Sequence, residues 1–154
     1  MNTTIVRLFS IQFFSLFFLL LSTNSLSAQT QVTWKQLADV RYEAKYLEDF
    51  GAEYLTPIFG KSPKLYDGKI VTVTGYMIPV DEEESAYIIS RNPYSSCYFC
   101  GNAGPETIVE LWIPASKRKR YKMDQRMTFK GKLKLNDTDV NHFIYILVDA
   151  QEHY

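Results

Sequence analysis

Alternation of apolar and polar residues, which is typical of half-buried β-strands, recurs along most of the chain after residue 29. This pattern predicts strands at residues 40–46, 69–80, 86–90, 125–135 and 142–150, and the run at 107–113, which is apolar on both faces, predicts a buried strand. Before the first strand, Trp34 and Leu37 are spaced as on one face of a short helix, with Thr33 as its N-cap. Residues 47–68 contain three glycines and two prolines without a sustained period, so a long connection with at most one helical turn is predicted there.

Two of the long predicted strands carry a glycine at the same point of a similar pattern. Residues 71–77 and 127–133 both read apolar, Thr, apolar, polar, Gly, any residue, apolar. A glycine inside an alternating strand weakens it unless the strand bends, bulges or lets another backbone approach. The pattern therefore predicts a mainly β fold: a small OB-like barrel of five or six strands with a short N-terminal helix, and a β-sandwich as the alternative.

The first 28 residues have the order of a secretory signal peptide. Arg7 precedes an apolar run, and small polar residues follow it up to Ala28. The run is short for a membrane span, so no stable span is expected after cleavage, and an uncleaved anchor is the alternative. We therefore predict a signal peptide at residues 1–28 and a single OB-like domain at residues 29–154, exported to the periplasm or secreted.

Composition adds support for strands and excludes some ligands. All eleven tyrosines lie after the leader, where they favour strands over helices. The chain has 17 basic and 17 acidic residues, so its net charge does not indicate a nucleic-acid partner. We interpret the basic residues at 117–122 as a solvated loop. No Ser-His-Asp order or phosphate-binding loop is present, so a non-enzymatic role is favoured.

The two cysteines, Cys97 and Cys100, lie three residues apart in the segment SSCYFCGNAGPE. Two thiolates in one turn can bind zinc, whereas an exported protein can also oxidise such a pair to a disulfide that pins the loop. A thioredoxin-type redox couple is less favoured, because a strand rather than a helix follows the pair. If zinc is bound, the candidate additional ligands are His142, Glu106, Glu110 and His153.

Several short motifs lie in an order similar to that of a family of exported bacterial proteins. They are Trp34 with Leu37, Gly68-Lys69 before a valine-rich strand, Gly75-Tyr76 followed by Pro79, and Cys97 before a proline-containing turn. On these motifs, the chain resembles the family catalogued as domain of unknown function 3299. The resemblance implies export and an OB-like barrel, and it implies no established activity. In the commoner form of that family a histidine follows the cysteine two residues later. The Cys-x-x-Cys of this chain has a second cysteine at nearly the same place, which exchanges one soft metal ligand for another.

Together, these features predict an exported, non-enzymatic OB-like binding or accessory module of the bacterial cell envelope. We expect an envelope protein as its partner, no nucleic-acid ligand, and a Cys-x-x-Cys turn able to hold zinc as cofactor. Two alternatives remain open. One is a redox-active or metal-dependent envelope enzyme that uses Cys97 and Cys100, and the other is a structural domain whose loop is pinned by a disulfide between them.

Overall fold

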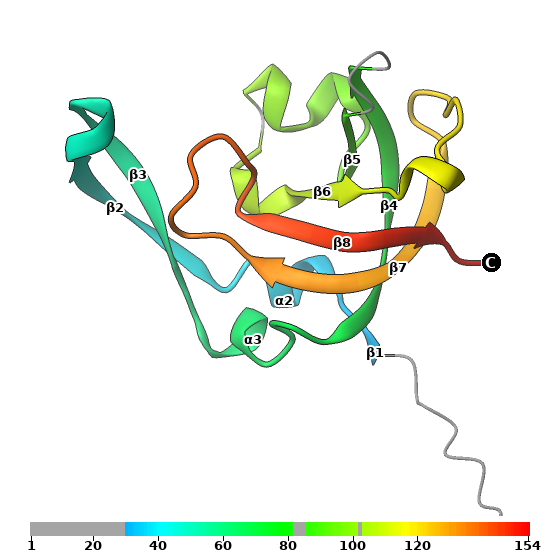
Figure 1. Cartoon of the computed structure of the whole chain (residues 1–154), viewed down its shortest axis with the longest axis horizontal. Coiled ribbons are helices and arrows are strands. Elements are labelled where there is room, and N and C mark those ends of the chain that lie inside the picture. The colour runs from blue at the N-terminus through cyan, green and yellow to red at the C-terminus, as the bar shows by residue number, and fades with distance from the viewer. Residues whose placement is uncertain (1–29, 82–85, 102) are drawn as a thin grey trace, which may run out of the picture.

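In the computed structural model, five strands close into a barrel and a short sixth strand extends the same sheet (Figure 1). The structure describes residues 30–81, 86–101 and 103–154, so the predicted signal peptide lies outside the described residues. The barrel strands are β4 (Ile70–Asp81), β5 (Ala86–Ser90), β6 (Ile108–Trp112), β7 (Arg126–Leu135) and β8 (Tyr145–Glu152).

The strand order around the barrel is β4-β5-β6-β8-β7, and β7 pairs back with β4. Strands β6 and β8 are parallel, whereas the other barrel pairs are antiparallel. The short strand β1 (Thr30–Gln31) pairs in parallel with β4 outside the closed ring. A small closed barrel of five strands is the architecture of an OB-fold, so the predicted fold class is confirmed.

Barrel closure depends on a bend in β4 at Gly75. This strand pairs with β7 up to Tyr76 and with β5 from Tyr76 onward. A Cβ atom on Gly75 would lie 2.4 Å from the backbone oxygen of Ser90, and one on Gly131 in β7 would lie 2.7 Å from that of Val148. Both glycines singled out by the repeated pattern therefore let a neighbouring backbone approach closely.

The barrel interior holds the main core, and Tyr145 links it to the N-terminal helix. Tyr145 is fully buried, and its hydroxyl group donates a hydrogen bond of 2.6 Å to the carbonyl oxygen of Leu37. Leu37 ends helix α2 (Trp34–Leu37), which begins with a capping box formed by Thr33 and Gln36. The predicted helix and its N-cap are therefore confirmed.

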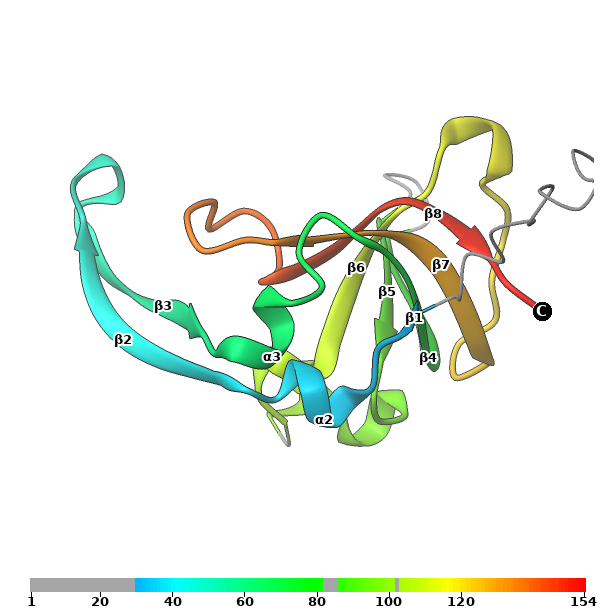
Figure 2. The ribbon, with the colours of Figure 1, turned by 90° about the horizontal axis from the view of Figure 1, so that it is seen from below.

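Residues 40–59 form a β-hairpin that projects from the barrel (Figure 2). Strand β2 (Val40–Leu47) pairs antiparallel with β3 (Ala52–Phe59) along its whole length, and the short helix α3 (Lys61–Lys64) follows. The prediction of an irregular connection after residue 46 was wrong. The predicted strand at 40–46 is present, but Ala44 and Tyr46 are exposed rather than half-buried.

Pro57 hid strand β3 from the sequence pattern, and the pairing geometry explains why it is tolerated. The N–H group of Gly60 donates to the carbonyl oxygen of Asp39 at 2.8 Å, which makes these two residues a hydrogen-bonded pair. Hydrogen-bonded and non-hydrogen-bonded pairs alternate along an antiparallel ladder, so Pro57, opposite Tyr42, occupies a non-hydrogen-bonded position. Its missing N–H group therefore costs the hairpin no ladder bond.

A second proline, Pro79, lies inside β4 although it cannot donate to the ladder. The strand continues past it to Asp81 through a register shift against β5. A bulge of this kind accommodates a residue that cannot donate a backbone hydrogen bond. Among the described residues, no helix has the length and apolarity needed to cross a membrane.

Replacing Gly75 by alanine is expected to lower the free energy of unfolding by about 3 kcal/mol, because the new methyl group meets the backbone oxygen of Ser90 and the side chains of Ile89 and Trp34. Urea denaturation would measure the change. Gly51→Ala is the matched control: a Cβ there meets nothing within 4 Å, and only the left-handed backbone at φ 60° is strained. That control is expected to cost about 1 kcal/mol. Equal losses in the two variants would contradict the role of Gly75 in closing the barrel.

Candidate functional site

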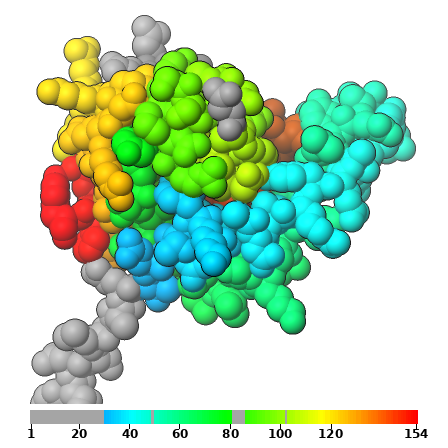
Figure 3. Space-filling view, turned by 180° about the vertical axis from the view of Figure 1, so that it is seen from behind, coloured from blue at the N-terminus to red at the C-terminus, as the bar shows by residue number. Residues whose placement is uncertain are grey.

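A groove of about 520 Å³ lies between the hairpin and the barrel. Tyr54, Leu55 and Pro57 of β3 line one side, and the loop of residues 136–144 between β7 and β8 lines the other. Tyr98, from the segment that contains the cysteines, also lines the groove. Figure 3 shows the hairpin standing away from the rounded body of the barrel.

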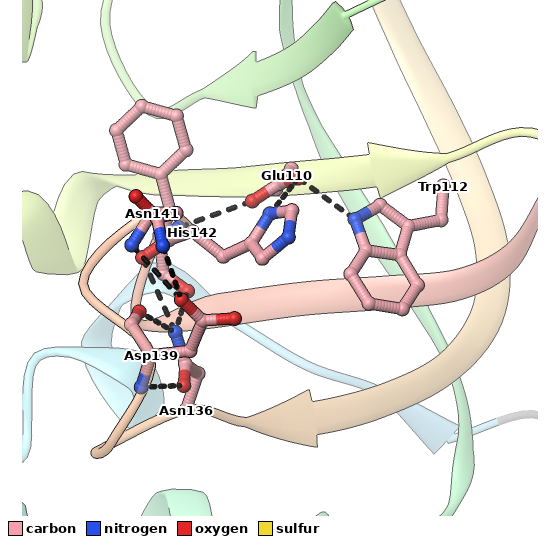
Figure 4. Close-up of polar contacts among 7 residues, drawn as sticks. Glu110, Trp112, Asn136, Asp139, Asn141 and His142 are labelled. Carbon is pink, nitrogen blue, oxygen red and sulfur yellow. Dashed lines mark hydrogen bonds and ion pairs between the residues drawn. The ribbon is translucent and has the colours of Figure 1, made fainter.

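The loop on the far side of the groove is held by Glu110, which projects from β6 (Figure 4). Oε1 of Glu110 lies 2.8 Å from Nδ1 of His142, and Oε2 accepts a 3.0 Å hydrogen bond from the backbone N–H group of Phe143. Nε1 of Trp112 donates to the same carboxylate at 2.7 Å. Both oxygens of Glu110 are therefore used in positioning the loop.

Asn136 orders the loop from within. Its side-chain amide donates to the carbonyl oxygens of Asp139, His142 and Phe143, at 2.7, 3.2 and 3.2 Å. Its side-chain oxygen accepts a 3.0 Å bond from the N–H group of Asp139. A hydrogen bond from the backbone N–H group of Asn141 lowers the pKa of Asp139, so this carboxylate stays charged. The loop therefore presents a fixed polar surface to the groove.

Tyr42 joins the hairpin to the segment that precedes β6. Its hydroxyl group donates a 3.0 Å hydrogen bond to Oε2 of Glu106. Burial, and then the hydrogen bond with Glu106, raise the pKa of the Tyr42 phenol well above its usual value. The phenol therefore remains a donor at any physiological pH, and this contact fixes the hairpin beside the groove.

The two cysteines lie in different surroundings. Cys97 is fully buried with Ile78, Ile88 and Ile108 in a small cluster separate from the main core. Cys100 is exposed, and its Sγ atom lies 3.1 Å from the carbonyl oxygen of Tyr94. Both cysteines are free, so Cys97 acts here as a small buried apolar side chain.

Three aromatic rings connect the cysteine segment to the loop beside the groove. Tyr98 and Phe99 pack edge to face with each other, with ring centroids 5.7 Å apart. Both also pack edge to face with Phe143, at 6.3 and 6.1 Å. Such pairs add to the stability gained from burial alone. The positions of the cysteine turn and of the β7–β8 loop are therefore linked.

The structure brings together only some of the predicted ligand candidates. Glu110 and His142 are in contact, but Glu106 is bonded to Tyr42, and the backbone N–H group of His153 bonds to β7. Within the described part of the chain, no three His, Cys, Asp or Glu side chains gather where they could hold a metal ion. The zinc and disulfide hypotheses for Cys97 and Cys100 remain predictions.

The groove itself was missed at the level of sequence. Its hairpin side was not predicted because β3 lacks alternation, and residues 136–141 indicated no more than a polar turn. The signal that could have suggested an ordered loop is the run Asn136, Asp137, Asp139 and Asn141, since Asn and Asp side chains bond nearby backbone groups in turns.

Thiol titration separates the hypotheses for Cys97 and Cys100. In the arrangement described here, a thiol reagent is expected to modify Cys100 alone in the native chain and both cysteines after unfolding. A disulfide would give no reactive thiol in either state before reduction. A zinc clamp would give stoichiometric zinc by elemental analysis that is lost in a Cys97→Ser variant.

Replacing Glu110 by alanine is expected to loosen the β7–β8 loop, because three donors lose their acceptor. We expect the free energy of unfolding to fall by about 2 kcal/mol and amide hydrogen exchange at Phe143 to accelerate. Trp112→Phe is the control, since it removes the indole donor and leaves the bond between Glu110 and Phe143. Unchanged exchange at Phe143 in Glu110→Ala would show that Glu110 does not hold the loop.

Comparison with known proteins gives a remote structural resemblance. No protein-family model matches the sequence, and no curated protein matches it. The chain is similar to the crystal structure of a DUF3299 family protein from Pseudomonas aeruginosa PAO1, with 15% sequence identity and a TM-score of 0.49, over 82% of this chain and 97% of that one. The sequence motifs predicted this resemblance, and the structural comparison confirms it. The comparison gives no information about activity.

Proposed function

We propose that this chain is an exported, non-enzymatic OB-like binding module that serves an assembly or transport system of the bacterial cell envelope. Its ligand is an extended segment of an envelope protein, held in the groove between β3 and the β7–β8 loop. The observation that carries this proposal is the groove, which combines exposed apolar side chains on both sides with the ordered polar groups of the β7–β8 loop.

The two sides of the groove suit a polypeptide segment. Leu55 on the hairpin side and Val140 on the loop side are exposed to 72% and 37%, and Tyr54 precedes Leu55 in β3, so apolar side chains of a ligand would find partners. The loop held by Asn136 offers carboxylate, amide and backbone groups for hydrogen bonds. Because Glu110 and Asn136 already order this loop, binding would cost little additional ordering of the protein.

The contacts of Glu110 and His142 favour binding over catalysis. These residues are the nearest approach to an acid–base pair beside the groove, at 2.8 Å. The second oxygen of Glu110 is engaged by the Phe143 N–H group, and Trp112 also donates to the carboxylate. Among the described residues, no hydroxyl or thiol group is bonded to the remaining nitrogen of His142, Nε2, so the pair has no nucleophile beside it to activate. The pair is therefore better suited to positioning the loop. The enzymatic alternative based on Cys97 and Cys100 remains a separate prediction.

Site-specific photo-crosslinking in the envelope of living cells would test the groove. A photoreactive amino acid in place of Leu55 is expected to give a discrete adduct with one envelope protein. Leu65 is the matched control, because it has a similar exposure of 61% and lies outside the groove. A second substitution across the groove, Val140→Asp, is expected to reduce the adduct strongly, because it places a charge where apolar contacts are needed. An adduct that forms equally from both leucine positions, or that is unaffected by Val140→Asp, would refute the proposal.

A further inference from the structure

The outer strand of the hairpin has a free edge. Among the described residues, β2 pairs with β3 alone, and beyond Tyr42, whose side chain is bonded to Glu106, the strand projects away from the barrel (Figure 2). Asp39 and Gly60 form a hydrogen-bonded pair, and hydrogen-bonded pairs recur at every second residue of an antiparallel ladder. The even-numbered residues Tyr42, Ala44 and Tyr46 therefore direct their backbone N–H and C=O groups away from β3. These groups can pair with another strand.

The sequence along this edge is complementary to itself when read in the opposite direction. Residues 42–46 are Tyr-Glu-Ala-Lys-Tyr, which is symmetric in type about Ala44 except that Glu43 and Lys45 carry opposite charges. In an antiparallel pair of two such strands centred on Ala44, each Glu43 lies opposite a Lys45, and each Tyr42 lies opposite a Tyr46. Opposite charges and aromatic pairs directly across two strands both stabilise a sheet.

We propose that two copies of this chain form a symmetric dimer through β2, with the two-fold axis passing beside Ala44. The two hairpins then make one four-stranded sheet in the order β3-β2-β2-β3. In this register, residues whose backbone N–H and C=O groups point away from β3 lie opposite one another, so the two β2 strands can form an uninterrupted ladder of hydrogen bonds. The hairpin projects from the body (Figure 3), and β2 spans about 26 Å at roughly 3.3 Å per residue, so the antiparallel register places the two barrels toward opposite ends of the four-stranded sheet.

Exposure and charge both favour this edge. Glu43, Ala44 and Lys45 are exposed, and Tyr46 is 54% exposed. Neither Glu43 nor Lys45 has an ion-pair partner within the described residues, so both are available to a second copy. Charges on an exposed edge strand commonly prevent pairing, but here their order makes the antiparallel pair attractive.

Other pairings are less favourable. An axis at Glu43 would place this residue opposite its own copy and Arg41 opposite Lys45, so like charges would face each other across the two strands. An axis at Tyr42 keeps opposite charges together but pairs only residues 40–44, whereas the axis at Ala44 pairs residues 41–47. The edge of β3 lacks a donor at Pro57 and lines the groove instead.

Charge exchange tests the dimer. The exported chain, purified from the envelope fraction, is expected to show a concentration-dependent monomer–dimer equilibrium by sedimentation. Glu43→Lys and Lys45→Glu should each lower the dimer association constant by about tenfold, because two attractive pairs become repulsive. The double variant with both substitutions should restore association. Glu53→Lys, an exposed charge change on β3, is the control and should leave association unchanged.

Cross-linking tests the register. In a Cys100→Ser background, Ala44→Cys is expected to give a covalent dimer on oxidation, since paired Cα atoms on the axis lie about 5.5 Å apart, within disulfide range. Lys45→Cys should give none, because that position meets Glu43 of the other copy. A chain that stays monomeric at all concentrations, a double charge variant that fails to recover, or equal cross-linking at both positions would overturn the proposal.

Discussion

Strand β4 pairs with β7 along its first half and with β5 along its second half, and the barrel is closed by this change of partner at Gly75. The backbone oxygen of Ser90 lies where a side chain at residue 75 would begin, so the bend requires glycine. Closure places β6 between β5 and β8. Glu110 on β6 thereby reaches the β7–β8 loop, and the groove depends on this contact.

Closure also creates an outer apolar surface that the chain must cover. Ile78, Ile88 and Ile108 come from three adjacent strands and are buried outside the main core, with Cys97 and Phe143 packed against them. The face of the second and third barrel strands is where OB-folds often bind ligands. Here the chain's own cysteine segment covers part of it, and the groove beside the hairpin is a separate accessible concave surface.

The hairpin presents two edges with different properties. A two-stranded hairpin is marginally stable in water by itself, so its base must be held by the rest of the chain. Phe59 is buried at that base, and Tyr42 is bonded to Glu106. Beyond these contacts the strands are exposed, and ligand binding along either edge would add stability to them. The edge toward the groove has Pro57, whereas the outer edge has an unbroken set of backbone donors.

Sequence alone determined the strands of the barrel, the capped helix and the two glycines at close approaches. Each leaves a local signal in the sequence: the strands by the spacing of their apolar residues, the helix by its capping residue, and the glycines by interrupting a strand pattern. It did not determine β3, since Pro57 breaks the local pattern and the strand exists only by pairing with β2. Glu110 and His142, which are in contact, lie 32 residues apart in the sequence. Cys97 is buried and Cys100 is exposed, because Cys97 packs against isoleucines from three strands. Such long-range contacts leave no local periodicity, so only the tertiary structure decided where the groove lies and which side chains face it.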